Sequence, residues 1–362
     1  MNKTPLHDHH TAMGAKMVNF GGYDMPVYYT GIAEEHQAVR THAGLFDVSH
    51  MGQLLIFGEN AQEFLQNILV SDISNLSPGC AMYTVMCNEN GGIIDDLLVY
   101  CYSDHYMLVV NAGNLEKNLE WLKRNNDEVV QIEDKSNRFS LLAVQGPNSR
   151  KIVSDFTRDS LEEVKFYQFI QSNQFNSPVT ISRTGYTGEL GYEIYCGNED
   201  ANFLWEDILK KGKGYGLVPA GLGARDLLRM EMKYCLYGND IDESTNPLEA
   251  GLGWVVGMEK DFFIGQEALK AMKNDISRKL ICFCMEERAI PRNGYSILVN
   301  DEEIGNVTSG GFSTVLNRGI GMGFVQRKYS KGGNQVGIDV RGKMKTALIK
   351  NPPLYTNGTL YS

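Results

Sequence analysis

The chain has 362 residues, a formal net charge of −10 and a pI of about 5.3. Its 43% hydrophobic and 22% charged residues are typical of a globular protein, and this length predicts two or three domains rather than one core. No stretch is both basic and aromatic, so we expect no nucleic-acid partner. No apolar run approaches the roughly 20 residues of a membrane helix, and residues 1–8 lack the apolar core of a signal peptide. We therefore expect a cytoplasmic protein without a membrane partner.

The seven cysteines are odd in number and include no Cys-x-x-Cys pair. Both observations argue against a disulfide framework and against a structural zinc site. We expect buried, inert thiols in a reducing compartment.

Within residues 1–56 the sequence predicts an aromatic loop, then a helix, and then a strand. The sequence predicts a helix over 32–41, which Gly44 follows as a stop signal. The preceding segment, 20–29, is rich in aromatic residues that serve either as core residues or as ligand walls. Residues 44–56 predict a turn that leads into a strand.

A compact α+β unit is expected from about residue 52 to 135. An apolar stripe predicts a helix over 60–69, and a second helix is predicted over 114–124. Three strands are predicted between them, over 81–86, 97–100 and 106–111, and a Gly91-Gly92 turn closes the first two into a hairpin.

Two adjacent carboxylates, Asp95 and Asp96, are expected where the 97–100 strand begins. Neighbouring side chains of a strand face opposite sides, so one carboxylate should point toward a core or cavity. A buried carboxylate is costly unless another group pairs with it. The pair is therefore either a turn-capping motif or the centre of a functional site.

The stretch from 139 to 278 combines strands, glycine-rich loops and helices. Strands are predicted over 139–146 and 179–183, and the glycines that follow match no phosphate-binding motif. A helix predicted over 223–232 carries Arg225 near its start, where a cation opposes the helix dipole. Arg225 therefore needs a partner, which is either a ligand or one of Asp226, Asp240 and Asp242. Residues 239–243 predict an acidic surface loop.

Short alternating segments separated by turns dominate from residue 279 onward. Strands are predicted over 282–285, 295–299, 319–325 and 336–340. This pattern predicts an all-β domain of the barrel or sandwich type.

Five segments together resemble the T-protein family of the glycine cleavage system, the aminomethyltransferases. They are 46–51 (FDVSHM), 86–96 (MCNENGGIIDD), 182–189 (SRTGYTGE), 219–226 (PAGLGARD) and 246–249 (NPLE). Each motif alone is moderately specific, whereas all five in this order are highly specific and span nearly the whole chain.

The resemblance implies an α+β multidomain fold in which three domains form a cloverleaf around a central folate channel. The domains would be 1–51 plus 139–278, then 52–138, and then a barrel-like all-β domain over 279–362. The implied reaction transfers the methylene of an aminomethyl group, carried on the lipoyl arm of H-protein, to tetrahydrofolate. Ammonia, 5,10-methylenetetrahydrofolate and dihydrolipoyl H-protein would be the products. Neither a metal nor a bound redox cofactor is implied.

The resemblance also implies roles for individual residues. Asp96 matches the essential carboxylate, which holds the reacting nitrogen and stabilises an iminium-like cation, and Asp95 would be its structural partner. Glu193 matches the glutamate that binds the pterin, while Arg225 and Tyr355 match other folate-contacting positions. Tyr83, Tyr167, Tyr186 and Met51 would be either channel walls or ordinary core residues.

Two related classes are alternatives to this function. Dimethylglycine and sarcosine dehydrogenases carry a flavin domain on the same chain, for which this sequence has neither a Gly-x-Gly-x-x-Gly motif nor room. Non-enzymatic folate-binding assembly factors carry a lone cysteine in a motif where this chain has 185–189 (GYTGE).

Overall fold

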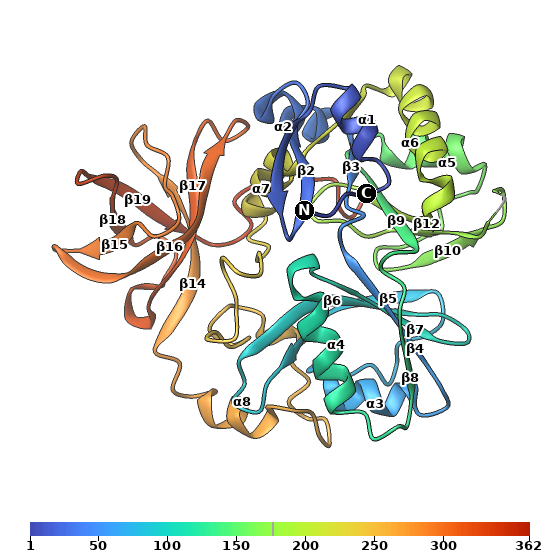
Figure 1. The fold of residues 1–362 in the computed structure, drawn as a ribbon. Coiled ribbons are helices and arrows are strands. Elements are labelled where there is room, and N and C mark those ends of the chain that lie inside the picture. Colours follow the sequence, from blue (N-terminus) through green and yellow to red (C-terminus); the bar gives the residue numbers. More distant parts are fainter. Residues whose placement is uncertain (176) are drawn as a thin grey trace.

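The computed structural model describes residues 1–175 and 177–362. Figure 1 shows three lobes, each built around its own sheet, with the chain passing between them several times. Within the described residues, none of the helices combines the length and apolarity that crossing a membrane requires.

The first lobe is a six-stranded sheet in the order β10-β11-β12-β9-β3-β13, antiparallel except for the β3–β13 pair. Its buried core contains Trp205 and Tyr192. The strands are β3 (Ala43–Asp47), β9 (Phe139–Gln145), β10 (Phe169–Ser172), β11 (Val179–Ser182), β12 (Gly191–Gly197) and β13 (Leu217–Pro219). The hairpin β1 (Lys16–Phe20) and β2 (Tyr23–Tyr28) and the helices α1 (His7–Ala12), α2 (Ile32–Thr41), α5 (Ser149–Thr157), α6 (Asn198–Gly212) and α7 (Leu222–Glu231) complete this part of the chain.

The second lobe is a five-stranded antiparallel sheet in the order β5-β6-β7-β4-β8, with two helices whose apolar stripes pack on it. Its members are β4 (Gly52–Phe57), α3 (Ala61–Ile68), β5 (Cys80–Cys87), β6 (Ile93–Cys101), β7 (Tyr106–Val110), α4 (Leu115–Arg124) and β8 (Gln131–Asp134). The predicted hairpin is confirmed, and Gly91 has a positive φ of 80° in its turn. However, β6 begins at Ile93, so Asp95 and Asp96 lie inside the strand rather than at its start.

The third lobe is a closed barrel of six strands in the order β14-β17-β16-β15-β18-β19, which confirms the predicted all-β domain. Its strands are β14 (Arg278–Met285), β15 (Ser296–Val299), β16 (Glu302–Ser313), β17 (Arg318–Gln326), β18 (Gln335–Asp339) and β19 (Met344–Lys350). The described residues also form four short 3-10 helices, η1 (Ala112–Asn114), η2 (Lys213–Tyr215), η3 (Gly253–Val255) and η4 (Arg327–Tyr329).

The segment before the barrel, which includes α8 (Gln266–Met272), packs against the second lobe. The Lys260 ammonium donates to the backbone oxygens of Gln66, Leu69 and Ser71 at the end of α3. The Ile264 amide also donates to the Asn67 oxygen. The division into 1–51 with 139–278, 52–138 and 279–362 stays a prediction.

The expected acidic surface loop at 239–243 is wrong in one respect, because Asp240 is buried. Arg229 of α7 donates to Asp240 at 2.5 Å, and its hydrogen bond to Ser309 of β16 at 2.7 Å joins the first lobe to the barrel. A buried charge that loses its ionic partner destabilises the folded state strongly.

We expect Arg229→Leu to lower the free energy of unfolding by about 3–5 kcal/mol, because it leaves Asp240 buried without its countercharge. Urea unfolding measures this change. The control is Arg327→Leu, which replaces an exposed arginine without an ion pair among the described residues and should change stability by less than about 0.5 kcal/mol. Equal losses in the two variants would contradict the role assigned to the pair.

Candidate active site

Asp95 is buried on β6 and is held by amides from the start of the α4 region. Its carboxylate accepts hydrogen bonds from the Asn111 backbone and side chain at 3.1 and 2.8 Å. The side chains of Asn114 and Asn118 donate to it at 2.7 and 2.5 Å. Burial raises the pKa of Asp95, and these amide donors oppose that rise. The Asp95 side chain is thus held in one position by amide hydrogen bonds.

Asp96, the next residue, has fewer donors and keeps part of its surface accessible. Tyr83 on β5 donates to Oδ2 at 3.0 Å, and the Asn111 side chain donates to Oδ1 at 2.8 Å. Burial, followed by the negative charge of Asp95, raises the pKa of Asp96 to about 7. A carboxyl group with this pKa changes its charge in the neutral pH range, which suits a group that gives or takes a proton.

An aromatic residue that the sequence did not single out lies beside this carboxylate. Trp254 of η3 is 71% exposed, and its ring stacks on Tyr83 with centroids 6.0 Å apart and planes at 22°. An exposed tryptophan held in place by such a stack is suited to cover a flat ligand next to Asp96. Its only signal in the sequence was its residue type.

Arg225 does not use any of the three aspartates proposed as its partners. Arg229, rather than Arg225, forms ion pairs with Asp226 and Asp240. Among the described residues, none forms a hydrogen bond or ion pair with the Arg225 guanidinium. Its guanidinium instead lies 4.6 Å from the ring centroid of Tyr186. Burial lowers the pKa of Arg225, while the charge of Glu193 favours its protonated form. The guanidinium therefore has free donors for a ligand.

Tyr186 connects Arg225 to the Asp96 region. Its hydroxyl donates to the Cys235 backbone oxygen, and its ring stacks on Tyr234 with centroids 5.7 Å apart. Burial raises the pKa of Tyr186, and the charges of Asp96 and Arg225 both act on it. Asp96, Tyr83, Tyr186, Arg225 and Glu193 therefore form one electrostatically connected group, drawn from two lobes.

Glu193 lies buried in the middle of β12, at the end of a chain of hydroxyl groups. Thr184 donates to its Oε2 at 2.5 Å, and Tyr100 lies 3.2 Å from the Thr184 hydroxyl. Tyr195 donates to Tyr100 at 3.0 Å. Burial raises the pKa of Glu193, whereas Thr184 and Arg225 stabilise its charged form. Because Tyr100 belongs to β6, this row of hydrogen-bonded hydroxyl groups links the strand of Asp96 to Glu193.

The remaining predicted residues lie around this group. Met51 and Tyr167 are partly buried against the apolar cluster between the two sheets, and Tyr167 has a positive φ of 65°. Tyr355 lies farther out, with its ring 4.2 Å from the Arg40 guanidinium. The structure thus brings six of the predicted residues together in one region, Met51 packs on the neighbouring apolar cluster, and Tyr355 contacts Arg40 and the Glu231 backbone.

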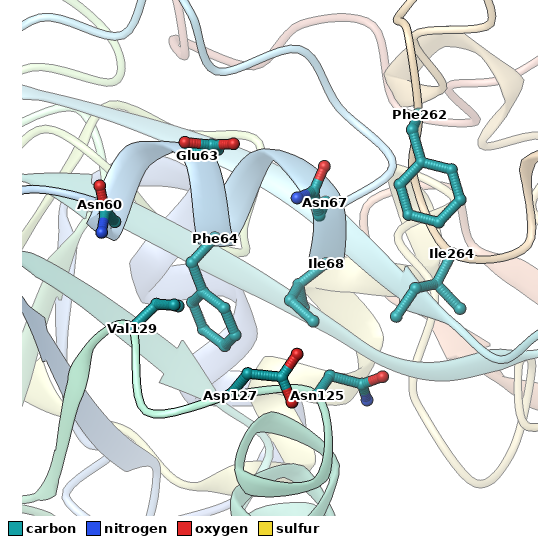
Figure 2. Close-up of a pocket in the computed structure, with 10 residues that line it drawn as sticks. All are labelled: Asn60, Glu63, Phe64, Asn67, Ile68, Asn125, Asp127, Val129, Phe262 and Ile264. Atoms are coloured by element: carbon teal, nitrogen blue, oxygen red, sulfur yellow. The ribbon is translucent and has the colours of Figure 1, made fainter.

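A surface pocket of about 420 Å³ lies elsewhere, between α3 and the turn after α4. Figure 2 shows Phe64, Ile68 and Ile264 around it, with Glu63 on α3 and Asp127 on the facing turn. None of the predicted site residues lines this pocket. Within residues 1–175 and 177–362, no cluster of three or more His, Cys, Asp or Glu side chains is arranged to hold a metal ion.

Comparisons with known proteins agree on one family. Residues 6–260 match the family model described as GCVT N-terminal domain, and residues 278–356 match the glycine cleavage T-protein C-terminal barrel domain. The chain is 49% identical to the aminomethyltransferase of Halothermothrix orenii, over 98% of this chain and 99% of that protein. It is 45% identical to that of Chloroherpeton thalassium, over 99% and 100%.

A solved structure agrees with the same assignment. The crystal structure of the glycine cleavage system aminomethyltransferase T from Bartonella henselae superposes with a TM-score of 0.93 at 34% identity, covering 99% of each chain. This match confirms the predicted α+β multidomain fold with its barrel. The chain therefore belongs to the glycine cleavage T-protein family of aminomethyltransferases.

Proposed function

We propose that this aminomethyltransferase takes the aminomethyl group from the lipoyl arm of H-protein and transfers its methylene to tetrahydrofolate at the Asp96 site. The observation that carries the proposal is Asp96 itself, a partly accessible carboxylate with a pKa near 7, fixed beside the fully bonded Asp95. The relatives' shared name supports the reaction class.

The reaction needs a carboxylate but places few other chemical demands on the protein. Folate nitrogens attack the aminomethyl carbon, its C–N bond breaks to release ammonia, and its C–S bond breaks to leave the dihydrolipoyl thiol. An iminium-like cation forms as these bonds exchange, and the Asp96 carboxylate stabilises it at close range. Tyr83 and Asn111 hold Asp96 in one orientation, so little reorganisation is needed.

The pterin and the rest of folate are assigned to the group around Glu193. The Thr184 hydroxyl donates a hydrogen bond to Oε2 of Glu193, whereas Oε1 accepts no hydrogen bond from the described residues. A carboxylate so placed can accept hydrogen bonds from the N–H groups of the pterin edge. Arg225 supplies a cation for an acidic part of the ligand, and Tyr83, Tyr167, Tyr186 and Met51 supply apolar walls.

The alternative function is a non-enzymatic folate-binding assembly factor, and the comparisons do not favour it. It shares folate binding with the transferase but not the release of ammonia. Tight folate binding by the wild-type protein without ammonia release from aminomethylated H-protein would support this alternative.

We expect Asp96→Asn to reduce kcat by about 10²–10⁴-fold, because the neutral amide cannot stabilise the developing cation. Ammonia release from aminomethylated H-protein and tetrahydrofolate measures the loss. Folate binding, measured separately by calorimetry, should stay within about threefold of wild type because the pterin contacts are unchanged. An active Asp96→Asn enzyme would refute the role of this carboxylate.

We expect kcat/KM to rise with pH through about 7, because only the ionised Asp96 carboxylate stabilises the cation and its pKa is about 7. Tyr83→Phe removes a hydrogen bond that lowers this pKa, so the midpoint of the profile should move to higher pH. The pH profiles of the two proteins test this shift. A profile that is flat between pH 6 and 8 would contradict it.

We expect Glu193→Gln to weaken tetrahydrofolate binding by about ten- to a hundredfold, since charge-assisted hydrogen bonds to the pterin become neutral ones. Saturating tetrahydrofolate should restore most of kcat. The matched control is Glu199→Gln, an exposed glutamate just beyond the same strand, which should bind folate as wild type does. Equal affinities of the wild type, Glu193→Gln and Glu199→Gln for tetrahydrofolate would show that Glu193 does not bind the folate.

A further inference from the structure

The two carboxylate oxygens of Glu193 have different surroundings. Oε1 accepts no hydrogen bond from the described residues, and it is not closed off from solvent. The Arg225 guanidinium is likewise unbonded among those residues and partly exposed, and each of the two charges favours the ionised form of the other. A carboxylate oxygen and a guanidinium that both face open space offer a ligand an acceptor and several donors. Oε1 is therefore the oxygen that a ligand can reach.

The other oxygen, Oε2, ends a row of three hydroxyl groups, those of Thr184, Tyr100 and Tyr195, called here the hydroxyl row. Thr184 donates to Oε2 at 2.5 Å, and the Tyr100 hydroxyl lies 3.2 Å from the Thr184 hydroxyl. Tyr195 donates to Tyr100 at 3.0 Å, and Ser182 lies beside the row, with its hydroxyl 3.0 Å from that of Thr184. All these side chains are buried, so each hydroxyl depends on its neighbours for hydrogen bonds.

The hydroxyl row has a direction, because each hydroxyl carries one hydrogen. Tyr195 donates to Tyr100, so the Tyr100 hydrogen is left for Thr184. The Thr184 hydrogen is then left for the Glu193 carboxylate. A proton on Oε2 would reverse these bonds and turn the Tyr195 hydrogen away from Tyr100. Among the described residues no other acceptor contacts the Tyr195 hydroxyl, and an unpaired buried donor makes the reversal unfavourable.

Tyr100 brings the second lobe into the hydroxyl row. Side chains alternate along a strand, so Asp96 and Tyr100 project from the same face of β6. Tyr100 packs there in one apolar cluster with Tyr195, which belongs to β12 as Glu193 does. The row therefore fixes the open carboxylate of the first lobe against the strand that carries Asp96.

We propose that Thr184 and Tyr100 are positioning residues for tetrahydrofolate binding, because the hydroxyl row holds Glu193 ionised with Oε1 left for the ligand. The proposal rests on the function proposed above, in which Glu193 accepts N–H groups of the pterin. It gives Thr184 and Tyr100 no contact with the ligand, since both act through Glu193.

The proposal makes binding depend on pH in a defined direction. Burial raises the pKa of Glu193, whereas the Thr184 hydrogen bond and the Arg225 charge lower it. Loss of the Thr184 bond therefore raises this pKa, and more of Glu193 is protonated at low pH, where it accepts pterin N–H groups poorly. Three tyrosines also face Glu193, and burial raises their pKa values so far that they stay neutral between pH 6 and 9: Tyr100, Tyr167 and Tyr195.

The test measures tetrahydrofolate affinity by calorimetry between pH 6 and 9 in full-length protein that carries Asp96→Asn, which removes the carboxyl group that titrates near pH 7. Thr184→Val removes the donor to Oε2, so it should weaken binding about tenfold at pH 6.5 and about twofold at pH 9. Tyr100→Phe should show the same trend, with a loss of about threefold at pH 6.5. Thr184→Ser keeps the hydroxyl and should restore the affinity.

Activity gives a second measurement in protein that retains Asp96. Ammonia release should show a higher KM for tetrahydrofolate in Thr184→Val, with kcat at saturation within about twofold of wild type. This split is expected because the substitution leaves the Tyr83 and Asn111 bonds to Asp96 in place.

A matched control contact joins the same two lobes. Tyr102, which follows β6, and Thr180 of β11 share a hydrogen bond of 2.9 Å between their hydroxyl groups. Among the described residues, neither hydroxyl is bonded to the hydroxyl row. Tyr102→Phe and Thr180→Val should therefore leave tetrahydrofolate affinity within about twofold at every pH.

The outcomes distinguish this inference from the proposed function. Wild-type protein that fails to bind tetrahydrofolate would refute the proposed function itself. Wild-type binding that Thr184→Val and Tyr100→Phe leave unchanged would refute only the inference. A loss of the same size at every pH, or equal losses in the control variants, would also refute it, because the hydroxyl row would then support the fold rather than the charge of Glu193.

Discussion

The arrangement of the site depends on the burial of Asp95 among asparagine amides. A carboxylate without solvent is costly, and only the donors of Asn111, Asn114 and Asn118 make its place on β6 tolerable. These asparagines precede or lie on α4, so the same bonds fix the helix against the strand. Asp96 is left as the less compensated of the two charges. Burial is the largest cause of its raised pKa, and the negative charge of Asp95 beside it adds to the rise.

A polar contact as well as an apolar one fixes the position of the six-stranded sheet relative to the five-stranded sheet. Tyr100 belongs to the strand of Asp96, yet its hydroxyl lies between Tyr195 and Thr184 of the other sheet. Since a hydroxyl donates only one hydrogen, the bonds run in one direction toward the Glu193 carboxylate. A buried network in which each hydroxyl is bonded favours a single arrangement of the two sheets. The spacing between the Asp96 and Glu193 carboxylates follows from this arrangement.

Local structure was largely predictable from the sequence, whereas long-range pairing was not. The apolar stripes and turn signals located the 32–41 helix, the hairpin at Gly91 and the β domain, because these depend on near neighbours. The motifs identified the family, and the roles of the site residues stay predictions that follow from it. The error at Asp240 arose because its partner, Arg229, lies on a separate helix. The asparagines around Asp95 and the stack of Trp254 on Tyr83 likewise join segments that no periodicity relates.

The connection between β3 and β9 has a consequence for how the chain acquires its structure during synthesis. These strands are hydrogen-bonded neighbours, but the whole five-stranded sheet lies between them in the chain. A ribosome delivers β3 well before β9, so β3 waits without this partner while the inserted residues emerge. All five strands of the inserted sheet come from this one continuous stretch, so the sheet can form during that wait. Once the inserted sheet has formed, the two ends of the insertion, which lead to β3 and β9, lie closer together. The loop that the β3–β9 pairing must close is then effectively shorter.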